Sequence, residues 1–309
     1  MLKWFDESVP CLDACVLTMG NFDGLHLGHR KVLSILHEKA KELGLPAVVL
    51  TYWEHPGHYV HLKHQVPILT PRPLKKELIR ACGSSQVYFI NFTTETAHVT
   101  ALTFLKEVLI EHFHPRLIVA GYDSHFGYRR EGNADFLSRY GVEFGYDTIR
   151  VEPVYQDTNI ISSTLIRDAL QQGDVRTAAA MLGEPYCLYG TVSHGKKLGR
   201  SIGFPTVNLN PIDNEQLIPA NGVYLSAVSF NQDHYFGLTN IGVSPTLKNN
   251  GQIEIETFIL DFDREMYGEN IRLEMLEFIR SEEHFPTVHA LKRAIEQDIR
   301  KGKELLAGL

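Results

Sequence analysis

Long apolar runs and cysteines are scarce in this sequence. No stretch of its 309 residues approaches the roughly 18 consecutive apolar residues that a membrane-spanning helix needs. The opening residues, MLKWFDESVP, lack the apolar core of a signal peptide. The 4 cysteines show no CxxC spacing, which is typical of reduced thiols in the cytoplasm. We therefore expect a cytoplasmic protein without a membrane partner.

Positive charge is also in deficit. The chain carries 30 lysines and arginines against 37 acidic residues, a formal net charge of −7. This balance argues against nucleic acid as a partner, because a polyanion favours a basic surface. A small anionic ligand is compatible with it, since a local site can be positive on an acidic protein. We expect small-molecule partners, and the composition leaves the oligomeric state open.

Apolar strands and amphipathic helices alternate in the first part of the chain. The predicted strands cover residues 14–20, 46–53, 86–92 and 116–121, and the predicted helices cover 29–44, 73–83, 101–113 and 162–183. This alternation predicts an α/β domain with a parallel sheet covered by helices on both faces.

The pattern changes from Pro185 onward. Short strands separated by turn residues are expected at 186–195, 221–230, 234–242, 253–262 and 270–280, followed by a helix at 287–306. Strands at this spacing predict a small antiparallel barrel or sandwich. We divide the chain into domains 1–183 and 184–309.

The stretch GNFDGLHLGH, residues 20–29, places two histidines where a strand passes into a helix. Unpaired N–H groups and the helix dipole favour a phosphate at such a junction. His26 and His29, one helical turn apart, are candidate catalytic donors to phosphate oxygens. The candidate ATP-binding residues beside them are Gly20, Asn21, Phe22, Asp23, Gly24 and Gly28. The alternative is that one histidine caps the helix and the other packs in the core.

Two further stretches carry phosphate-binding chemistry. In IISSTLIRDAL, residues 160–170, the candidates are Ser162, Ser163, Thr164 and Arg167, three hydroxyls and a forked cation at a helix start. In GTVSHGKKLGRSIGFPTVNL, residues 190–209, a glycine-rich turn supplies Gly195, Lys196, Gly199 and Arg200. Thr206 and Asn208 follow it, and their oxygens suit Mg²⁺. The alternatives are an ordinary helix cap and a basic surface hairpin.

These stretches together resemble a known family. GNFDGLHLGH resembles the signature of the nucleotidylyltransferases in the form found in bacterial FAD synthetases, and IISSTLIRDAL resembles their ISSTxIR motif. Residues 190–209 resemble the riboflavin kinase signature, with its PTAN element at 205–208. The resemblance implies a Rossmann-like nucleotidylyltransferase domain followed by a riboflavin kinase barrel.

The resemblance also implies residue roles. Glu256, in IETFILDF, is the expected catalytic base of the kinase, although Glu254 shares the same strand face. His55, Asp123 and Arg280 are the expected flavin contacts. Glu54 in TYWEHP and Ser124 in GYDSHFG depart from the family pattern, in TFxPHP and GxDFxFG respectively. The histidine-rich run 55–64 looks like a metal ladder, but its Pro-Gly start favours a solvated loop.

The resemblance covers nearly the whole chain. It implies phosphorylation of riboflavin to FMN and adenylylation of FMN to FAD, with ATP as co-substrate, Mg²⁺ as cofactor and FMN and FAD as product ligands. Two alternatives stay open. One is an enzyme that retains only one activity, and the other is a flavin-binding regulatory protein.

Overall fold

The structure is a computed structural model of the chain. It describes residues 3–5, 9–54, 66–83, 86–194, 199, 202–243 and 253–308. The described chain forms two compact units, Met1–Ser163 and Thr164–Leu309. The predicted boundary between residues 183 and 184 lies further along the chain, after two helices that group with the second unit.

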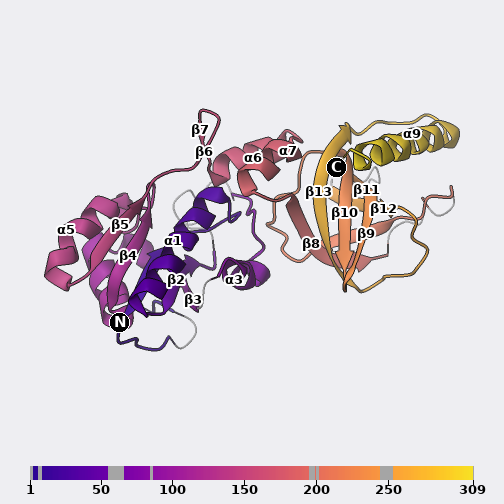
Figure 1. Cartoon of the computed structure of the whole chain (residues 1–309). Coiled ribbons are helices and arrows are strands. Elements are labelled where there is room, and N and C mark those ends of the chain that lie inside the picture. The colour runs from indigo at the N-terminus through magenta and orange to yellow at the C-terminus, as the bar shows by residue number, and fades with distance from the viewer. Residues whose placement is uncertain are drawn as a thin grey trace. The chain divides into compact units, whose positions relative to one another are not determined.

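The first unit is built on a parallel sheet (Figure 1). Its strands are β1 (Cys15–Met19), β2 (Ala47–Tyr52), β3 (Gln86–Ile90), β4 (Pro115–Gly121) and β5 (Asp147–Val151). They lie in the order β3-β2-β1-β4-β5, and every neighbouring pair is parallel. The α/β prediction is therefore confirmed, with β5 as an additional edge strand that was not predicted.

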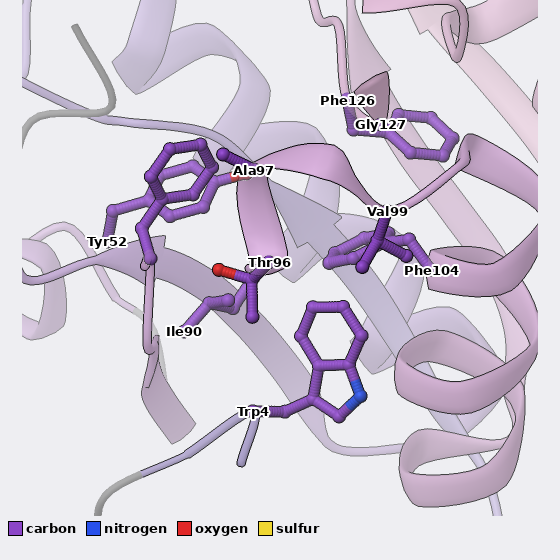
Figure 2. A pocket seen from close by; sticks show the side chains of 10 residues that line it. Trp4, Tyr52, Ile90, Thr96, Ala97, Val99, Phe104, Phe126 and Gly127 are labelled. Carbon is purple, nitrogen blue, oxygen red and sulfur yellow. The ribbon is translucent and has the colours of Figure 1, made fainter. Parts of the chain in front are cut away.

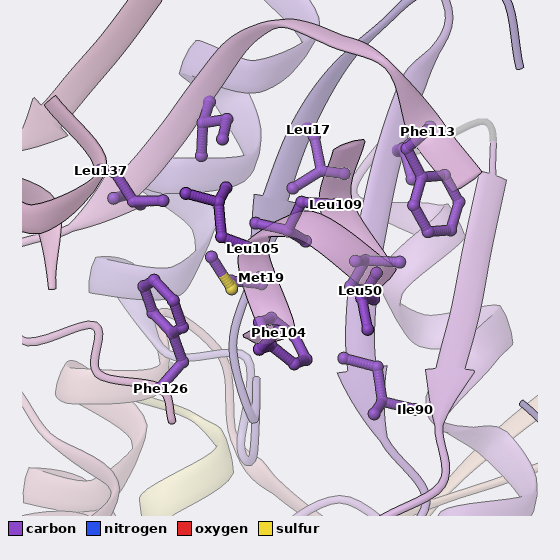
Figure 3. Packing of buried hydrophobic residues seen from close by; sticks show 14 of the residues in the cluster. Leu17, Met19, Leu50, Ile90, Phe104, Leu105, Leu109, Phe113, Phe126 and Leu137 are labelled. Carbon is purple, nitrogen blue, oxygen red and sulfur yellow. The ribbon is translucent and has the colours of Figure 1, made fainter. Parts of the chain in front are cut away.

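Helices cover both faces of this sheet. On one face, α1 (Leu27–Leu43) and α3 (Arg72–Ala81) pack through Leu33, Leu36 and Ile79. They share this core with Val16 of β1 and Val49 of β2. The other face is covered by α4 (Ala101–Phe104), the π-helical segment η2 (Leu105–Phe113) and α5 (Ala134–Phe144). Figure 3 shows Leu105 and Leu109 of η2 among the side chains of this second layer. Successive strand residues point alternately into the two cores, as expected for a sheet that is buried on both faces.

The ends of α1 follow from its sequence. His26 precedes the helix in extended conformation and acts as its N-cap, and Gly44 ends it with a left-handed φ of 65°. Glycine reaches this conformation without a Cβ penalty. The predicted stop at Gly44 is confirmed, whereas the helix begins two residues before the predicted start, because the cap lies at His26.

The single helix predicted over residues 162–183 is wrong. The structure has two, α6 (Ser163–Gln171) and α7 (Val175–Leu182). Gly173 between them has a φ of 79°, and the Asp174 carboxylate accepts the N–H of Thr177 at 3.0 Å to start the second helix. The left-handed glycine thus ends α6, and the capping aspartate begins α7.

The second unit is a closed antiparallel barrel, so of the barrel and sandwich alternatives the barrel is confirmed. Its strands are β8 (Tyr186–Ser193), β9 (Val207–Pro211), β10 (Gly222–Phe230), β11 (Asp233–Val243), β12 (Ile253–Ile259) and β13 (Asn270–Arg280). They close in the order β10-β11-β12-β9-β8-β13. Helix α9 (Val288–Leu306) packs on the outside through Ile299, Leu305 and Leu306.

The described residues also form shorter elements. They are η1 (Thr96–His98), η3 (Tyr128–Arg130), and the hairpin strands β6 (Tyr155–Gln156) and β7 (Asn159–Ile160).

Candidate active sites

The order of the parallel sheet locates the first candidate site. The chain runs outward from β1 to β2 and β3, and then returns to place β4 on the other side of β1. Ligands of open parallel sheets bind beyond the carboxyl ends of the strands where the order reverses. The loop after β1, residues 20–25, and the loop after β4, residues 121–127, lie at this point. The motifs GNFDGLHLGH and GYDSHFG, which contain these two loops, therefore lie at the same edge of the sheet.

The loop after β1 has an unusual backbone. Phe22, Gly24 and Leu25 have φ angles of 51°, 86° and 46°, all in the left-handed region. Conformations of this kind in residues other than glycine are typical of functional loops held by their surroundings. Gly20 lies against the Phe22 ring, because a Cβ at that position would be 3.2 Å from it. A larger residue there would displace the ring.

Asp23 holds this loop to the segment before α3. Asp23 is 3% exposed, and its carboxylate accepts the N–H groups of Leu69 and Thr70, each at 2.9 Å. The Thr70 hydroxyl accepts the N–H of Gly24 at 2.7 Å. Asp23 therefore shapes the loop through the protein backbone, and a direct contact with ATP stays a prediction.

The second motif meets the first at Asp23. The Ser163 hydroxyl donates to the backbone carbonyl of Asp23 at 2.8 Å, although 140 positions separate them. The two distant stretches are thus in contact within the first unit. Ser162 lies beside Ser163 and is half-buried. Thr164 and Arg167 lie on α6 in the second unit, and their phosphate contacts stay predictions.

The two histidines stack at the start of α1. Their ring centroids are 3.6 Å apart and their planes differ by 16°. The Nδ1 of His26 accepts the backbone N–H of His29 at 3.3 Å, so the proton of the neutral His26 ring lies on Nε2. Gly28 leaves room for this ring, since a Cβ there would be 3.0 Å from it. Capping, the alternative role of one histidine, is present in His26 and uses its Nδ1, so a ligand contact of this ring would come from Nε2–H.

Burial keeps both imidazoles neutral. Loss of solvation lowers the pKa of His26 to about 4, although the nearby Asp23 opposes the shift. The pKa of His29 is well below its usual value because of burial, with further repulsion from His26 and Lys75. Its Nδ1 is a buried atom without a hydrogen-bond partner in the described structure. At neutral pH the pair can donate or accept hydrogen bonds but carries no charge.

A buried cation that the sequence reasoning missed lies beside them. Lys75 on α3 is 4% exposed, and its ammonium donates to Tyr52 O at 2.8 Å and Asn21 Oδ1 at 3.3 Å. Lys75 and Ile79 are four residues apart, on the buried stripe of the helix. The sequence could have indicated this residue, because its helical spacing places the lysine on the apolar face of the predicted helix.

A small cavity lies among residues of the core on the sheet face opposite α1 and α3 (Figure 2). We call it the aromatic pocket. Its lining residues are Trp4, Tyr52, Ile90, Phe92, Thr96, Ala97, Val99, Phe104, Phe126 and Gly127. Water-sized molecules can occupy about 40 Å³ of it. Most of the lining side chains are apolar, and Tyr52 and Phe126 belong to the two predicted flavin motifs.

The predicted flavin residues of the first unit are placed in part. Asp123 is exposed in the loop after β4, and its carbonyl lies 2.7 Å from Nδ1 of His125. Ser124, the departure from the family pattern, donates its N–H to Gly121 O at 3.1 Å and closes the turn. His55 and the rest of the histidine-rich run 55–64 lie outside the described residues.

The second candidate site lies on the outer face of the barrel. Ile255, Thr257 and Ile259 of β12 are buried, so the alternate residues Glu254 and Glu256 face outward and are half-buried. Glu256 lies opposite Asn208 of β9 on one side and Asn240 of β11 on the other. Paired residues of antiparallel strands share a face. Glu256 and Asn208, predicted from separate motifs, are thus neighbours.

The glycine-rich turn is only partly described. Gly195, Lys196 and Arg200 lie outside the described residues. Gly199 lies against Thr206, because a Cβ at Gly199 would be 3.3 Å from the Thr206 hydroxyl. Thr206 immediately precedes β9 and is half-buried. The end of the turn therefore meets the start of the strand that carries Asn208.

The oxygen donors here fit Mg²⁺ held together with ATP. Among the described residues, no group of three or more His, Cys, Asp or Glu side chains is placed to hold a metal. Thr206 and Asn208 offer neutral oxygens, with the Glu256 carboxylate opposite Asn208. Mg²⁺ is usually bound through few protein oxygens, several waters and substrate phosphates.

Arg280 has a protein partner at the end of β13. Its guanidinium binds both carboxylate oxygens of Asp298 on α9, at 2.8 to 3.1 Å. The guanidinium also lies 5.4 Å from the centroid of the Phe285 ring. The arginine therefore ties α9 to the barrel, and its flavin contact stays a prediction.

Comparison with known proteins identifies the family of each unit. Both units match families of transferases. The family described as FAD synthetase matches residues 9–165, and the family described as riboflavin kinase matches residues 182–306. The chain belongs to the family of bifunctional riboflavin kinase/FMN adenylyltransferases.

Individual relatives agree over almost the full length. The bifunctional riboflavin kinase/FMN adenylyltransferase of Haemophilus influenzae is 36% identical over 304 residues, which cover 98% of each chain. The protein of the same description from Listeria monocytogenes is 35% identical and covers 95% of this chain and 93% of its own. The FAD synthetase and riboflavin kinase resemblances read from the motifs are thereby confirmed.

A solved structure shares the whole fold. It is described as a macrolide-efflux protein from Streptococcus pneumoniae, is 30% identical, covers 96% of both chains and has a TM-score of 0.87. Efflux is a description of that protein. In the part of the present chain that the structure describes, no helix has both the length and the apolar character needed to cross a membrane.

Proposed function

We propose that this chain makes FAD in two steps at two separate sites. The second unit transfers the γ-phosphoryl group of ATP to riboflavin, giving FMN and ADP. The first unit joins FMN to the AMP part of a second ATP and releases pyrophosphate. The presence of both family matches, in this order within one chain, carries the proposal. The functional division falls between residues 183 and 184, and both reactions take place in the cytoplasm.

In the second unit, Glu256 is the general base. Its carboxylate takes the proton of the ribityl 5′-hydroxyl while that oxygen attacks the γ-phosphorus and the bond to ADP breaks. Gly195, Lys196, Gly199 and Arg200 bind the phosphates. Thr206 and Asn208 hold Mg²⁺, which when bound neutralises phosphate charge. The cross-strand pairing of Glu256 with Asn208 supports a shared site.

In the first unit, an oxygen of the FMN phosphate attacks the α-phosphorus of ATP. His26 donates from Nε2 and His29 from its ring to oxygens of that phosphate, where negative charge builds up. The other contacts with ATP come from Gly20, Asn21, Phe22, Asp23, Gly24, Gly28, Ser162, Ser163, Thr164 and Arg167. The stacked pair at the helix start and the bond between Ser163 and Asp23 support this assignment.

The flavin binds near the aromatic pocket during adenylylation. The apolar edge of the ring system enters the pocket, and His55 and Asp123 contact the polar atoms outside it. Phe126, which follows Asp123 in the same loop, is part of the lining and supports this placement. In the kinase site, Arg280 contacts the flavin from the end of β13.

The test is product analysis. The purified full chain is incubated with ATP and Mg²⁺, once with riboflavin and once with FMN, and the flavins are separated by chromatography. We expect FMN and FAD from riboflavin, and FAD from FMN. FAD from FMN alone would leave only the adenylyltransferase, and FMN without FAD would leave only the kinase. Tight flavin binding without ATP consumption would indicate a regulatory protein and contradict the proposal.

A further inference from the structure

Lys75 is a buried cation whose neighbours do not account for its charge. Its ammonium has three N–H donors and makes two hydrogen bonds, to Tyr52 O at 2.8 Å and to Asn21 Oδ1 at 3.3 Å. Both acceptors are neutral. Among the described residues, no carboxylate forms an ion pair with it, and Asp23 acts on it only from a longer distance. Burying an ammonium without a paired anion is costly. A purely structural role, in which Lys75 only links two neutral oxygens, therefore does not account for a charged side chain at this position.

The position of the ammonium is informative. Helix α3 packs on the same face of the sheet as α1, and the Tyr52 ring lines the aromatic pocket associated with the opposite face. Lys75 reaches across the carboxyl end of β2 to the Tyr52 carbonyl. Its second partner, Asn21, belongs to the loop that leads to the stacked histidines. The ammonium therefore lies between the loop of the histidine pair and the residues that line the aromatic pocket.

We propose that Lys75 is a substrate-contacting catalytic residue of adenylyl transfer, and that its third N–H group binds the phosphate of FMN. This inference rests on the adenylyl transfer proposed for the first unit. In that reaction an FMN phosphate oxygen forms a new bond to the α-phosphorus. The bond from the α-phosphorus to the bridging oxygen breaks, and pyrophosphate leaves with the electron pair.

This chemistry needs a cation between the reactants. The attacking phosphate monoester carries nearly two negative charges at neutral pH, and the triphosphate is also an anion. The two repel each other as they approach, and a fixed positive charge in a site sheltered from water lowers that barrier. His26 and His29 are neutral in this structure, so they provide hydrogen bonds without charge. Lys75 is the buried ammonium beside them.

The test uses the full chain and three substitutions, Lys75→Gln, Lys75→Met and Lys75→Arg. Glutamine retains an N–H donor without charge, methionine removes both, and arginine retains both. Arg80→Met is the matched control, because Arg80 is an exposed cation on the same helix. For each protein, kcat and KM are measured for FAD formation with FMN and with ATP varied. Riboflavin phosphorylation and the unfolding temperature are measured on the same samples.

The expected pattern is specific to the FMN phosphate. Lys75→Gln and Lys75→Met should lower kcat/KM for FMN by about 100-fold or more, the usual effect of removing a group that stabilises transition-state charge. The kcat/KM of Lys75→Arg for FMN should be at least about tenfold higher than that of Lys75→Gln or Lys75→Met, because arginine restores the charge. Arg80→Met should stay within about twofold of the unsubstituted chain. Riboflavin phosphorylation should be unchanged in all four, and the unfolding temperature should not fall in Lys75→Met.

Three results would overturn the inference. The first is full FAD-forming activity in Lys75→Gln, because an uncharged N–H donor would then be sufficient and the residue would have only a structural role. The second is a defect confined to the KM for ATP, which would place the ammonium on the triphosphate alone. The third is loss of folding in every Lys75 variant. Failure of the unsubstituted chain to make FAD from FMN would instead contradict the proposed function itself.

Discussion

The two units present their candidate sites on different kinds of surface. In the first unit the chemistry-bearing groups are deeply buried at a sheet edge, where Asp23, His26 and Lys75 are 3%, 6% and 4% exposed. In the second unit Glu256, Asn208 and Thr206 are half-buried on the outside of a barrel. The first site therefore depends on burial, which changes the protonation of its side chains. The second depends on strand register, which sets acid and amide groups side by side.

This difference predicts how each site fails. A buried site is sensitive to a change of packing or protonation, whereas a register-built site is sensitive to the loss of one functional group. Each substitution below affects one site and leaves the other as an internal control.

The largest effect is expected from Glu256→Gln. The amide cannot take a proton from the attacking hydroxyl, so FMN formation should fall about 1,000-fold, within the usual range for a general base. FAD formation from supplied FMN should be unchanged. Glu254→Gln is the matched control, since this residue lies on the same strand face two positions earlier. Equal losses in the two variants would contradict the assignment of Glu256.

His29→Ala should have the opposite selectivity. Removing one hydrogen-bond donor to a developing negative charge typically costs about 100- to 1,000-fold in rate. FAD formation from FMN should fall by that factor, while riboflavin phosphorylation continues. His98→Ala, a substitution of an exposed histidine in the same unit, serves as the control. Unchanged FAD formation in the His29 variant would remove this residue from the reaction.

The pH dependence of FAD formation separates the contributions of the imidazoles and the ammonium. Burial lowers the pKa of Lys75 to about 8, while Asp23 opposes the shift and His29 is the neighbouring neutral ring. The charged form is lost as pH rises through 8, so kcat/KM for FMN should fall about tenfold per pH unit above it. The histidines are already neutral at pH 6, because the pKa of His26 is about 4. They should therefore add no ionisation between pH 6 and 8.

Lys75→Arg provides the control for this profile. A guanidinium remains protonated throughout the range, so the decline above pH 8 should disappear even if the maximum rate is lower. A decline that persists in this variant would assign the ionisation to another group.

The smallest effect is expected from Gly28→Ala. The new methyl group would lie 3.0 Å from Cε1 and 3.1 Å from Nδ1 of His26, so the ring must move by a few tenths of an ångström. Small displacements of a catalytic group lower rates strongly, and we expect a loss of about tenfold in FAD formation. The unfolding temperature should not fall, because alanine is a better helix former than glycine. A rate equal to that of the unsubstituted chain would mean that the stacked position of His26 is not required.

Much of the fold was predictable from the sequence because its patterns are local. Apolar strands followed by amphipathic helices indicated the parallel sheet, and Gly44 marked the end of the first helix. The break at Gly173 and Asp174 was missed because residues 162–183 keep a helical apolar pattern across it. The π-helical winding of Leu105–Phe113 has no sequence signal that we identified.

The candidate sites were predictable to a different degree. The histidine pair and the serines after β7 were found from motifs, and the bond between Ser163 and Asp23 brings them together. The loop-holding role of Asp23 could not be foreseen, since it depends on two N–H groups of a distant segment. Arg280 was assigned to a ligand, whereas its partner in the structure is Asp298, which comes from a helix later in the chain. Lys75 was read as part of an ordinary amphipathic helix.

The most direct test of the account is a mixing experiment with Glu256→Gln and His29→Ala. Each variant alone, given riboflavin, ATP and Mg²⁺, should make FAD at no more than about a hundredth of the rate of the unsubstituted chain, because one is impaired in the first step and the other in the second. An equimolar mixture should make FAD, since FMN released by the His29 variant can be adenylylated by the Glu256 variant. Rapid FAD formation by either variant alone, or no gain in the mixture while each retains its own half-reaction, would contradict the claim of two independent sites.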